Sequence, residues 1–127
     1  MQQSKPRSTQ SKAKTARSSG VVRIIGGSMR GRKLRFNTVD GLRPTLDRVR
    51  ETLFNWLARD ISRCHCLDLF AGSGALSFEA LSRGTQSVVL VEKNPKVARD
   101  LKNNCQLLKV NNAKVINLDS EKFLKTN

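Results

Sequence analysis

The junction between an apolar run and a helix-forming segment near the middle of the chain most constrains the fold. The segment Cys66-Leu67-Asp68-Leu69-Phe70-Ala71-Gly72-Ser73-Gly74-Ala75 has the pattern of a buried strand that passes through an acidic residue into two glycines and then a helix. Without a Cβ, Gly72 and Gly74 allow a sharp turn and let a ligand approach the backbone, while free N–H groups at the start of the helix attract negative charge. The junction therefore predicts an α/β fold with a nucleotide-cofactor site.

The position of Asp68 bears on which cofactor this is. The dinucleotide fingerprint G-x-G-x-x-G/A needs a third small residue, and this chain has Ser77 there, with Asp68 standing before the first glycine. A carboxylate at this place repels a pyrophosphate but attracts the cationic amino-acid head of S-adenosylmethionine. The pattern favours S-adenosylmethionine over NAD, with a plain strand-to-helix turn as the alternative without a ligand.

Two more apolar runs end in acids. The run 87–91 leads to Glu92, whose carboxylate can accept both hydroxyls of an adenosine ribose, although NAD proteins use the same acid. The run 113–118 leads to Asp119, which can accept a hydrogen bond from an adenine amino group or simply cap the next helix, with Ser120 as a rival cap. Ligands of open α/β sheets bind at the carboxyl edge, where all three acids are expected.

Length and cysteine content limit the class of protein. The 127 residues, 38% of them hydrophobic, suit a single domain. The odd number of cysteines fits a reducing cytoplasm better than a disulfide framework. Cys64-His65-Cys66 suggests zinc, but four ligands cannot be assembled from the remaining candidates, so we expect no metal. No apolar run is long enough to cross a membrane, and we expect no membrane partner.

Charge is the second strong signal. The chain holds 24 lysines and arginines against 10 acids, a net charge of +14, and residues 1–35 contain ten basic residues and no acid. Residues 1–20 have too few apolar side chains to order themselves, so we expect a disordered basic arm, or in the simplest alternative a solubilising tail. A polyanionic partner is predicted.

A basic hairpin and a linker are expected over residues 21–44. The runs 21–25 and 30–36 have the pattern of two strands joined around Gly26-Gly27. Basic side chains there would contact RNA phosphates, with affinity that falls with salt, although a solvated strand face explains any single residue equally well. The candidate RNA-binding residues are Arg30, Arg32, Lys33, Arg35 and Arg43.

Residues 45–127 are expected to form an α/β unit. A helix from Leu46 to about Ala58, capped by Thr45, should turn a stripe inward that includes Val49 and Trp56, so Trp56 is expected to pack in the core and not to stack on a base. The other members of this stripe are Leu46, Leu53 and Leu57.

A second helix is predicted after the run 87–91. Asn94 should cap it, Pro95 should occupy its first turn, and Val97, Leu101 and Leu108 should face inward. The order is hairpin, helix, then β-α-β-α-β, and right-handed crossovers predict a parallel sheet, which we expect to carry helices on both faces.

Three segments together closely resemble the bacterial ribosomal small-subunit methyltransferase D family over residues 21–124. They are Gly26-Gly27-x-x-Arg30-Gly31-Arg32-Lys33-Leu34, Leu42-Arg43-Pro44-Thr45-x-Asp47-Arg48-Val49-Arg50-Glu51-Thr52-Leu53-Phe54-Asn55-Trp56-Leu57, and the glycine junction with Glu79-Ala80-Leu81-Ser82-Arg83-Gly84. The resemblance implies a Rossmann-like, S-adenosylmethionine-dependent enzyme that methylates N2 of a guanine in 16S ribosomal RNA. Its partner would be that RNA or the small ribosomal subunit.

The resemblance also assigns roles to residues at the expected cofactor site. Asp68, Phe70, Gly72 and Gly74 match the cofactor-binding motif, and Glu92 matches the ribose-binding acid. Two further assignments are Asp119 at the adenine side and Thr45 near the methionine end of the cofactor.

One family element has no counterpart. The catalytic Asp or Asn followed by Pro-Pro-Phe/Tyr is absent, so no catalytic residue can be named, and Asn94-Pro95-Lys96 does not replace it. We therefore expect the chain to be the N-terminal part of such an enzyme, with its first sheet strand left at an exposed edge through which copies can associate. The alternative function is a noncatalytic RNA-binding remnant, and an NAD-binding oxidoreductase is less favoured.

Overall fold

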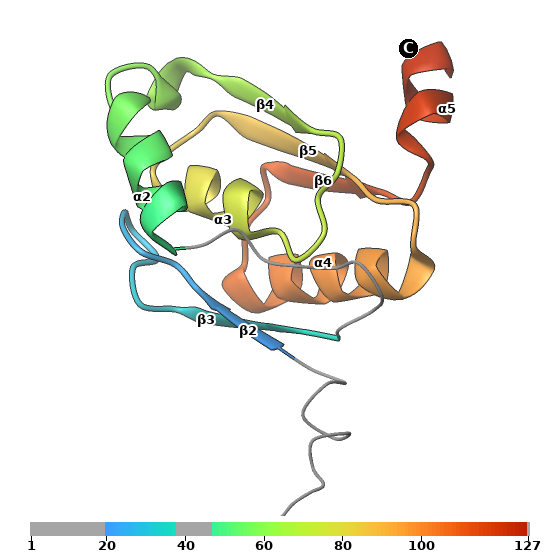
Figure 1. The fold of residues 1–127 in the computed structure, drawn as a ribbon, viewed down its shortest axis with the longest axis horizontal. Coiled ribbons are helices and arrows are strands. Elements are labelled where there is room, and N and C mark those ends of the chain that lie inside the picture. Colours follow the sequence, from blue (N-terminus) through green and yellow to red (C-terminus); the bar gives the residue numbers. More distant parts are fainter. Residues whose placement is uncertain (1–19, 38–46, 127) are drawn as a thin grey trace, which may run out of the picture.

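The computed structural model describes residues 20–37 and 47–126 (Figure 1). The N-terminal elements are β2 (Gly20–Arg23), β3 (Lys33–Phe36), helix α2 (Asp47–Trp56) and the short 3-10 helix η1 (Ile61–Arg63). The elements that follow are β4 (His65–Asp68), α3 (Ala75–Ser82), β5 (Ser87–Val91), α4 (Pro95–Leu108), β6 (Ala113–Ile116) and α5 (Ser120–Thr126). The predicted order of hairpin, helix and β-α-β-α-β unit is confirmed. The predicted arm lies outside the described residues except for Gly20, as do Arg43, Thr45 and Leu46.

The three parallel strands pair in the order β4-β5-β6. Asp68 lies opposite Leu90, and Val91 lies opposite Ile116, so the carboxyl ends of the strands meet at one edge. The central strand β5 is rich in β-branched residues, which suit a strand with neighbours on both sides. β4 forms one side of this sheet, and the side chain of Leu67 is 50% exposed there.

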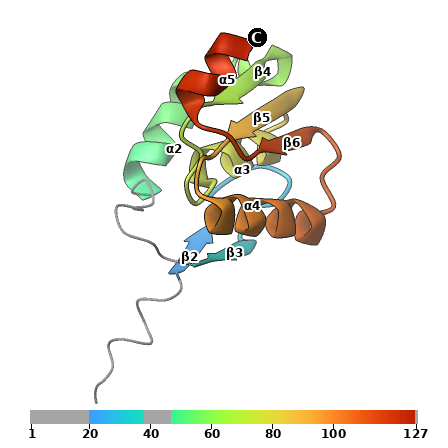
Figure 2. The same cartoon turned by 90° about the vertical axis from the view of Figure 1, so that its right-hand side faces the viewer.

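Helices α3 and α4 lie on the same face of the sheet, between it and the hairpin, as both views show (Figures 1 and 2). The expectation of helices on both faces is therefore wrong for this part of the fold. The strand order steps in one direction from β4 to β6, and two right-handed crossovers that step in the same direction place both helices on one side. Phe78 of α3 and Leu101 of α4 belong to the same core cluster as Val88 and Leu90.

The core lies between the sheet, these two helices and the hairpin. Val97, Leu101 and Leu108 of α4 are all buried, as predicted. The predicted cap of this helix is also confirmed, since the Asn94 side chain accepts hydrogen bonds from the backbone N–H groups of Lys96 and Val97. Within the part of the chain that the structure describes, no helix is long and apolar enough to span a membrane.

The two strands of the hairpin are antiparallel, with Val22 opposite Leu34 and Arg23 opposite Lys33. The period of two along a strand separates the faces, so that apolar side chains point to the helices and basic ones to solvent. The buried side chains are Val22, Ile24, Leu34 and Phe36. The predicted hairpin is confirmed as a structural element.

Helix α2 turns a different face inward from the one predicted. Arg50 and Phe54 are buried, whereas Val49 is 53% exposed and Trp56 is 78% exposed. The prediction that Trp56 packs in the core is wrong, because the buried carboxylate of Glu79 lies 3.4 Å from Nε of Arg50 and draws that side of the helix inward. The prediction from helical periodicity treats an arginine as a surface residue, so it chose the face with Val49 and Trp56 over the face with Arg50. Of that stripe, Leu53 and Leu57 do pack against the core.

Candidate cofactor site

The loop from the end of β4 to the start of α3 has the sharp turn that its glycines predict. The N–H of Ala71 donates to the carbonyl of Val91 at 3.1 Å, and the N–H of Gly74 donates to the carbonyl of Ala71 at 2.8 Å. Gly72 and Gly74 have φ angles of 54° and 83°, in the region that favours glycine. A Cβ at Gly74 would lie 2.5 Å from the ring of Phe78, so this glycine is also required for packing.

Asp68 lies at the end of β4 and is half buried. Its Oδ2 accepts a hydrogen bond from the Ser77 hydroxyl at 2.8 Å, and its Oδ1 accepts one from the N–H of Phe70 at 3.2 Å. Ser77 occupies the place where a dinucleotide site has its third small residue, and here the hydroxyl orients the acid. Each carboxylate oxygen can accept a second hydrogen bond, so Asp68 still has acceptor capacity.

Glu92, directly after β5, approaches the same loop from the other side. Its Oε1 accepts a hydrogen bond from the N–H of Gly72 at 2.9 Å, and its Oε2 accepts one from the N–H of Asn94 at 3.1 Å. The structure therefore brings four predicted residues together around one turn: Asp68, Gly72, Gly74 and Glu92.

The first turn of α3 adds hydrogen-bond donors to this cluster. Gly74 is its N-cap, and no side chain caps the helix there. The N–H groups at the beginning of a helix have no partners within the helix and carry partial positive charge. The turn therefore has one acid on each side, Asp68 and Glu92, and N–H donors at its end. These groups suit a ligand that carries a cation, vicinal hydroxyls and a carboxylate, and S-adenosylmethionine has all three.

The remaining predicted cofactor residues have different surroundings. Oδ1 of Asp119 accepts hydrogen bonds from the N–H groups of Glu121 at 2.9 Å and Lys122 at 3.3 Å, which is the geometry of a helix cap. Phe70 is 80% exposed. Thr45 is outside the described residues.

The candidate RNA-binding residues Arg30, Arg32, Lys33 and Arg35 are all exposed on the hairpin and its turn, while Arg43 lies outside the described part. The sequence reasoning missed Arg23, which is also exposed and stands directly opposite Lys33. Like charges directly opposite each other on a sheet destabilise it, and a bound anion relieves the repulsion.

A buried ionic cluster around Glu79 was also missed. Its carboxylate is fully buried and accepts hydrogen bonds from the N–H groups of Ile25 at 3.0 Å and Gly26 at 2.9 Å, and from Nε of Arg83 at 2.8 Å. Arg50 completes the cluster and donates from Nη2 to the carbonyl of Arg23 at 2.7 Å. An acid inside the apolar segment of α3, with an arginine four residues later, was the signal that could have revealed it. The cluster fixes the hairpin to α3, the helix whose other end carries the glycine loop.

The Cys64-His65-Cys66 triplet has ordinary structural partners. Nδ1 of His65 lies 2.7 Å from the Ser87 hydroxyl, and Sγ of Cys66 lies 3.3 Å from the Thr85 hydroxyl. Successive residues of a strand point to opposite faces, so this histidine and its neighbouring cysteines do not converge on one ion.

The chain is similar to several proteins that are named as methyltransferases. It is 55% identical over 106 residues to ribosomal RNA small subunit methyltransferase D of Escherichia coli (strain K12), and the match covers 84% of this chain and 54% of that protein. The solved structure of the candidate methyltransferase yhhF from Escherichia coli has a TM-score of 0.75 at 55% identity, covering 83% of this chain and 57% of that chain. The S-adenosylmethionine-dependent methyltransferase from Agrobacterium tumefaciens has a TM-score of 0.62 at 18% identity, covering 86% of this chain and 35% of that chain.

These likenesses define the class first. The fold is the Rossmann-like fold of S-adenosylmethionine-dependent methyltransferases, as predicted. The family described as conserved hypothetical protein 95 matches residues 22–127, and the chain belongs to this family. The predicted resemblance to the small-subunit methyltransferase D proteins is confirmed. The chain spans 54% of the length of the curated Escherichia coli relative.

Proposed function

We propose that this chain binds S-adenosylmethionine at the glycine loop and serves the methylation of N2 of a guanine in 16S ribosomal RNA. One observation carries the proposal: Asp68 and Glu92, at the ends of neighbouring parallel strands, flank one glycine turn. The names of the relatives support ribosomal RNA as the substrate class. The cofactor, when bound, supplies an electrophilic methyl group.

Each residue of the site has a role in holding that cofactor. The carboxylate of Asp68 attracts its cationic amino group, and the N–H groups at the start of α3 attract its carboxylate. Glu92 accepts hydrogen bonds from the ribose hydroxyls, for which its present bond to Gly72 leaves acceptor capacity. The resemblance assigns Asp119 to the adenine side and Thr45, which lies outside the described residues, to the methionine end, while Phe70 offers an exposed ring.

RNA contact is assigned to the basic face of the hairpin. Arg30, Arg32, Lys33 and Arg35, with Arg43 of the linker, would contact phosphates and give affinity that falls with salt. The repulsion between Arg23 and Lys33 is relieved by a phosphate between them. The cytoplasmic small ribosomal subunit or its RNA is the proposed partner.

A second candidate function is RNA binding without catalysis. Guanine N2 is a poor nucleophile because its lone pair is delocalised into the ring, so transfer needs groups that hold the amine in line with the methyl group. The family resemblance assigns that role to an Asp/Asn-Pro-Pro-Phe/Tyr element, and none of the three prolines of this sequence has a proline neighbour. The absence of a Pro-Pro pair from this sequence favours RNA binding without catalysis by the residues of this chain.

The first experiment is a calorimetric titration of S-adenosylmethionine into the purified chain. The Asp68→Asn variant removes one negative charge but keeps an acceptor for Ser77, and Asp60→Asn removes a charge from an exposed ion pair with Arg63 as the matched control. We expect saturable binding by the wild type and Asp60→Asn, and binding about tenfold weaker in Asp68→Asn. Absence of binding by a chain that circular dichroism shows to be folded would overturn the cofactor assignment.

A methyl-transfer assay separates the two candidates. Incubation with 16S ribosomal RNA and labelled S-adenosylmethionine should label the RNA if these residues complete a transferase. Retained RNA binding with no label in the RNA would favour the noncatalytic role.

A further inference from the structure

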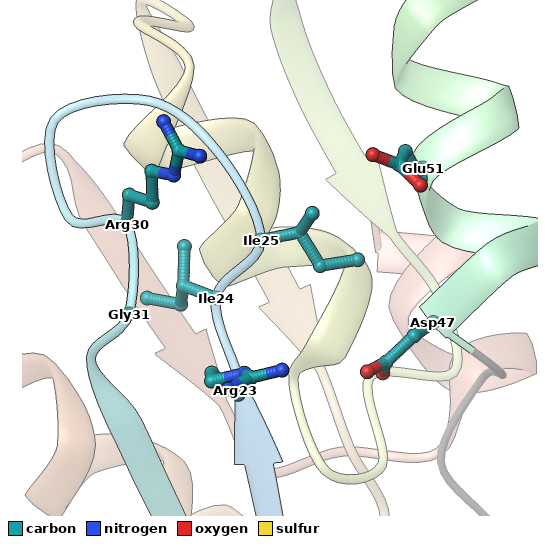
Figure 3. A pocket seen from close by; sticks show the side chains of 7 residues that line it. All are labelled: Arg23, Ile24, Ile25, Arg30, Gly31, Asp47 and Glu51. Atoms are coloured by element: carbon teal, nitrogen blue, oxygen red, sulfur yellow. The ribbon is translucent and has the colours of Figure 1, made fainter.

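A pocket separates the turn of the basic hairpin from helix α2. It has a volume of about 400 Å³ and is open to solvent. Its lining comes from the hairpin and its turn (Arg23, Ile24, Ile25, Arg30 and Gly31) and from α2 (Asp47 and Glu51). Figure 3 shows Asp47 and Glu51 on one side and Arg23 and Arg30 on the other. The pocket shares no lining residue with the cofactor loop.

The two acids of this pocket differ in their bonding. Asp47 is neutralised in part, because its Oδ1 lies 3.0 Å from Nη2 of the buried Arg50. Glu51 is exposed, and its side chain makes no hydrogen bond or ion pair with residues 20–37 or 47–126. Its carboxylate therefore has its full acceptor capacity available to a ligand.

The combination of charges selects the ligand chemistry. Two arginines attract a phosphate, whereas a carboxylate beside them repels it, so a phosphate alone uses only half of the pocket. A lysine or arginine of a protein partner would be repelled by Arg23 and Arg30. A nucleotide satisfies both sides, because it carries a phosphate and a base whose edge can donate hydrogen bonds to a carboxylate.

Guanine is the base that matches Glu51. Its N1–H and N2–H donors lie side by side and can donate to the two oxygens of one carboxylate, whereas adenine, cytosine and uracil pair each donor with an acceptor. The apolar side chain of Ile25, which is partly exposed in the lining, offers a surface for the ring. The volume is in the range of pockets that hold small molecules.

We propose that this pocket takes an unpaired guanine nucleotide of the bound RNA, read by Glu51 and held by its phosphate on Arg30. This guanine is a recognition contact, separate from the base that receives the methyl group. The inference rests on the proposed function, because it assumes that the hairpin faces RNA, and it adds a sequence preference that phosphate contacts alone do not provide.

The test measures the affinity of the full chain for short single-stranded RNAs that differ at one position. One RNA carries guanine there, a second carries inosine, which lacks the N2 amino group, and a third carries adenine. We expect the wild type to bind the guanine RNA about tenfold more tightly than the inosine RNA. Equal binding of the three RNAs would overturn the inference, while the S-adenosylmethionine titration would stand as a separate test of the proposed function.

Variants assign the preference to the pocket. Glu51→Gln should lose most of the preference for guanine, and Asp60→Asn, which removes one exposed negative charge elsewhere, should keep it. Arg30→Ala should lower the affinity for all three RNAs by a similar factor. It should also reduce the slope of log affinity against log salt concentration by about 0.7. A guanine preference that survives Glu51→Gln in a chain with wild-type circular dichroism would also overturn the inference.

Discussion

Replacing Gly27 by alanine should destabilise the fold far more than the same replacement at Gly31. Both residues have nearly the same positive φ, 83° and 84°, so the backbone strain of an added Cβ is matched at about 1–2 kcal/mol. A Cβ at Gly27 would lie 2.0 Å from the carbonyl oxygen of Ser82, whereas a Cβ at Gly31 meets nothing within 4 Å. The difference between the variants isolates the contact of the hairpin turn with α3.

The size of that difference follows from the hydrogen bonds that the shift would break. The N–H of Ser28 donates to the carbonyl of Ser82 at 2.8 Å, and the N–H of Met29 donates to its hydroxyl at 2.9 Å. Losing two such bonds costs about 1 kcal/mol each, and more where a buried group is left unsatisfied. We expect Gly31→Ala to lower the free energy of unfolding by about 1–2 kcal/mol and Gly27→Ala by about 3–5 kcal/mol.

Urea unfolding followed by far-ultraviolet circular dichroism measures both values. A difference of this size moves the midpoint by about 1 M urea for a small protein. Two variants with midpoints within about 0.3 M of each other would refute the argument that the turn depends on close contact with α3.

Three further predictions concern other parts of the molecule. Phe54→Ala should lower the free energy of unfolding by about 3–5 kcal/mol in the same urea assay, and Trp56→Ala by less than about 1 kcal/mol. The opposite order would show that the helix face predicted from sequence, which contains Trp56, is the one packed in the core. Burial raises the pKa of the Cys105 thiol, so its alkylation, followed by mass spectrometry, should be slower in the folded chain at pH 8 than after urea unfolding. If the wild type associates through the exposed strand β4, the variant Leu67→Lys should associate less in sedimentation velocity. A variant with the same sedimentation profile as the associating wild type would exclude this strand as the contact.

The sequence predicted the order of elements because local chemistry determines most of it. The Asn94-Pro95 pair specifies a helix start through one side chain and one fixed φ angle. The glycine junction was recognisable because a turn with two positive φ angles restricts the residues that can occupy it. Features of this kind depend on residues close together in the chain.

Features that depend on contacts distant in sequence could not be predicted. Arg50 and Glu79 are buried because each neutralises the other, and neither residue alone predicts burial. The face of α2 was wrong for this reason. The cluster of Asp68 and Glu92 was predicted as a common edge, but their bonds to Ser77 and Gly72 required the folded loop.

The attachment of the hairpin decides how the molecule unfolds. A two-stranded hairpin is only marginally stable in water by itself, so β2 and β3 depend on what they pack against. α3 contributes Glu79 and Ser82, while α4 contributes Asn104, whose side chain donates to the carbonyl of Arg35 at 3.0 Å. Opening the hairpin would remove the backbone donors of Ile25 and Gly26 from the Glu79 carboxylate. The hairpin amides that bond to Glu79 and Ser82 should therefore exchange with solvent together, when the hairpin separates from α3 as one cooperative unit.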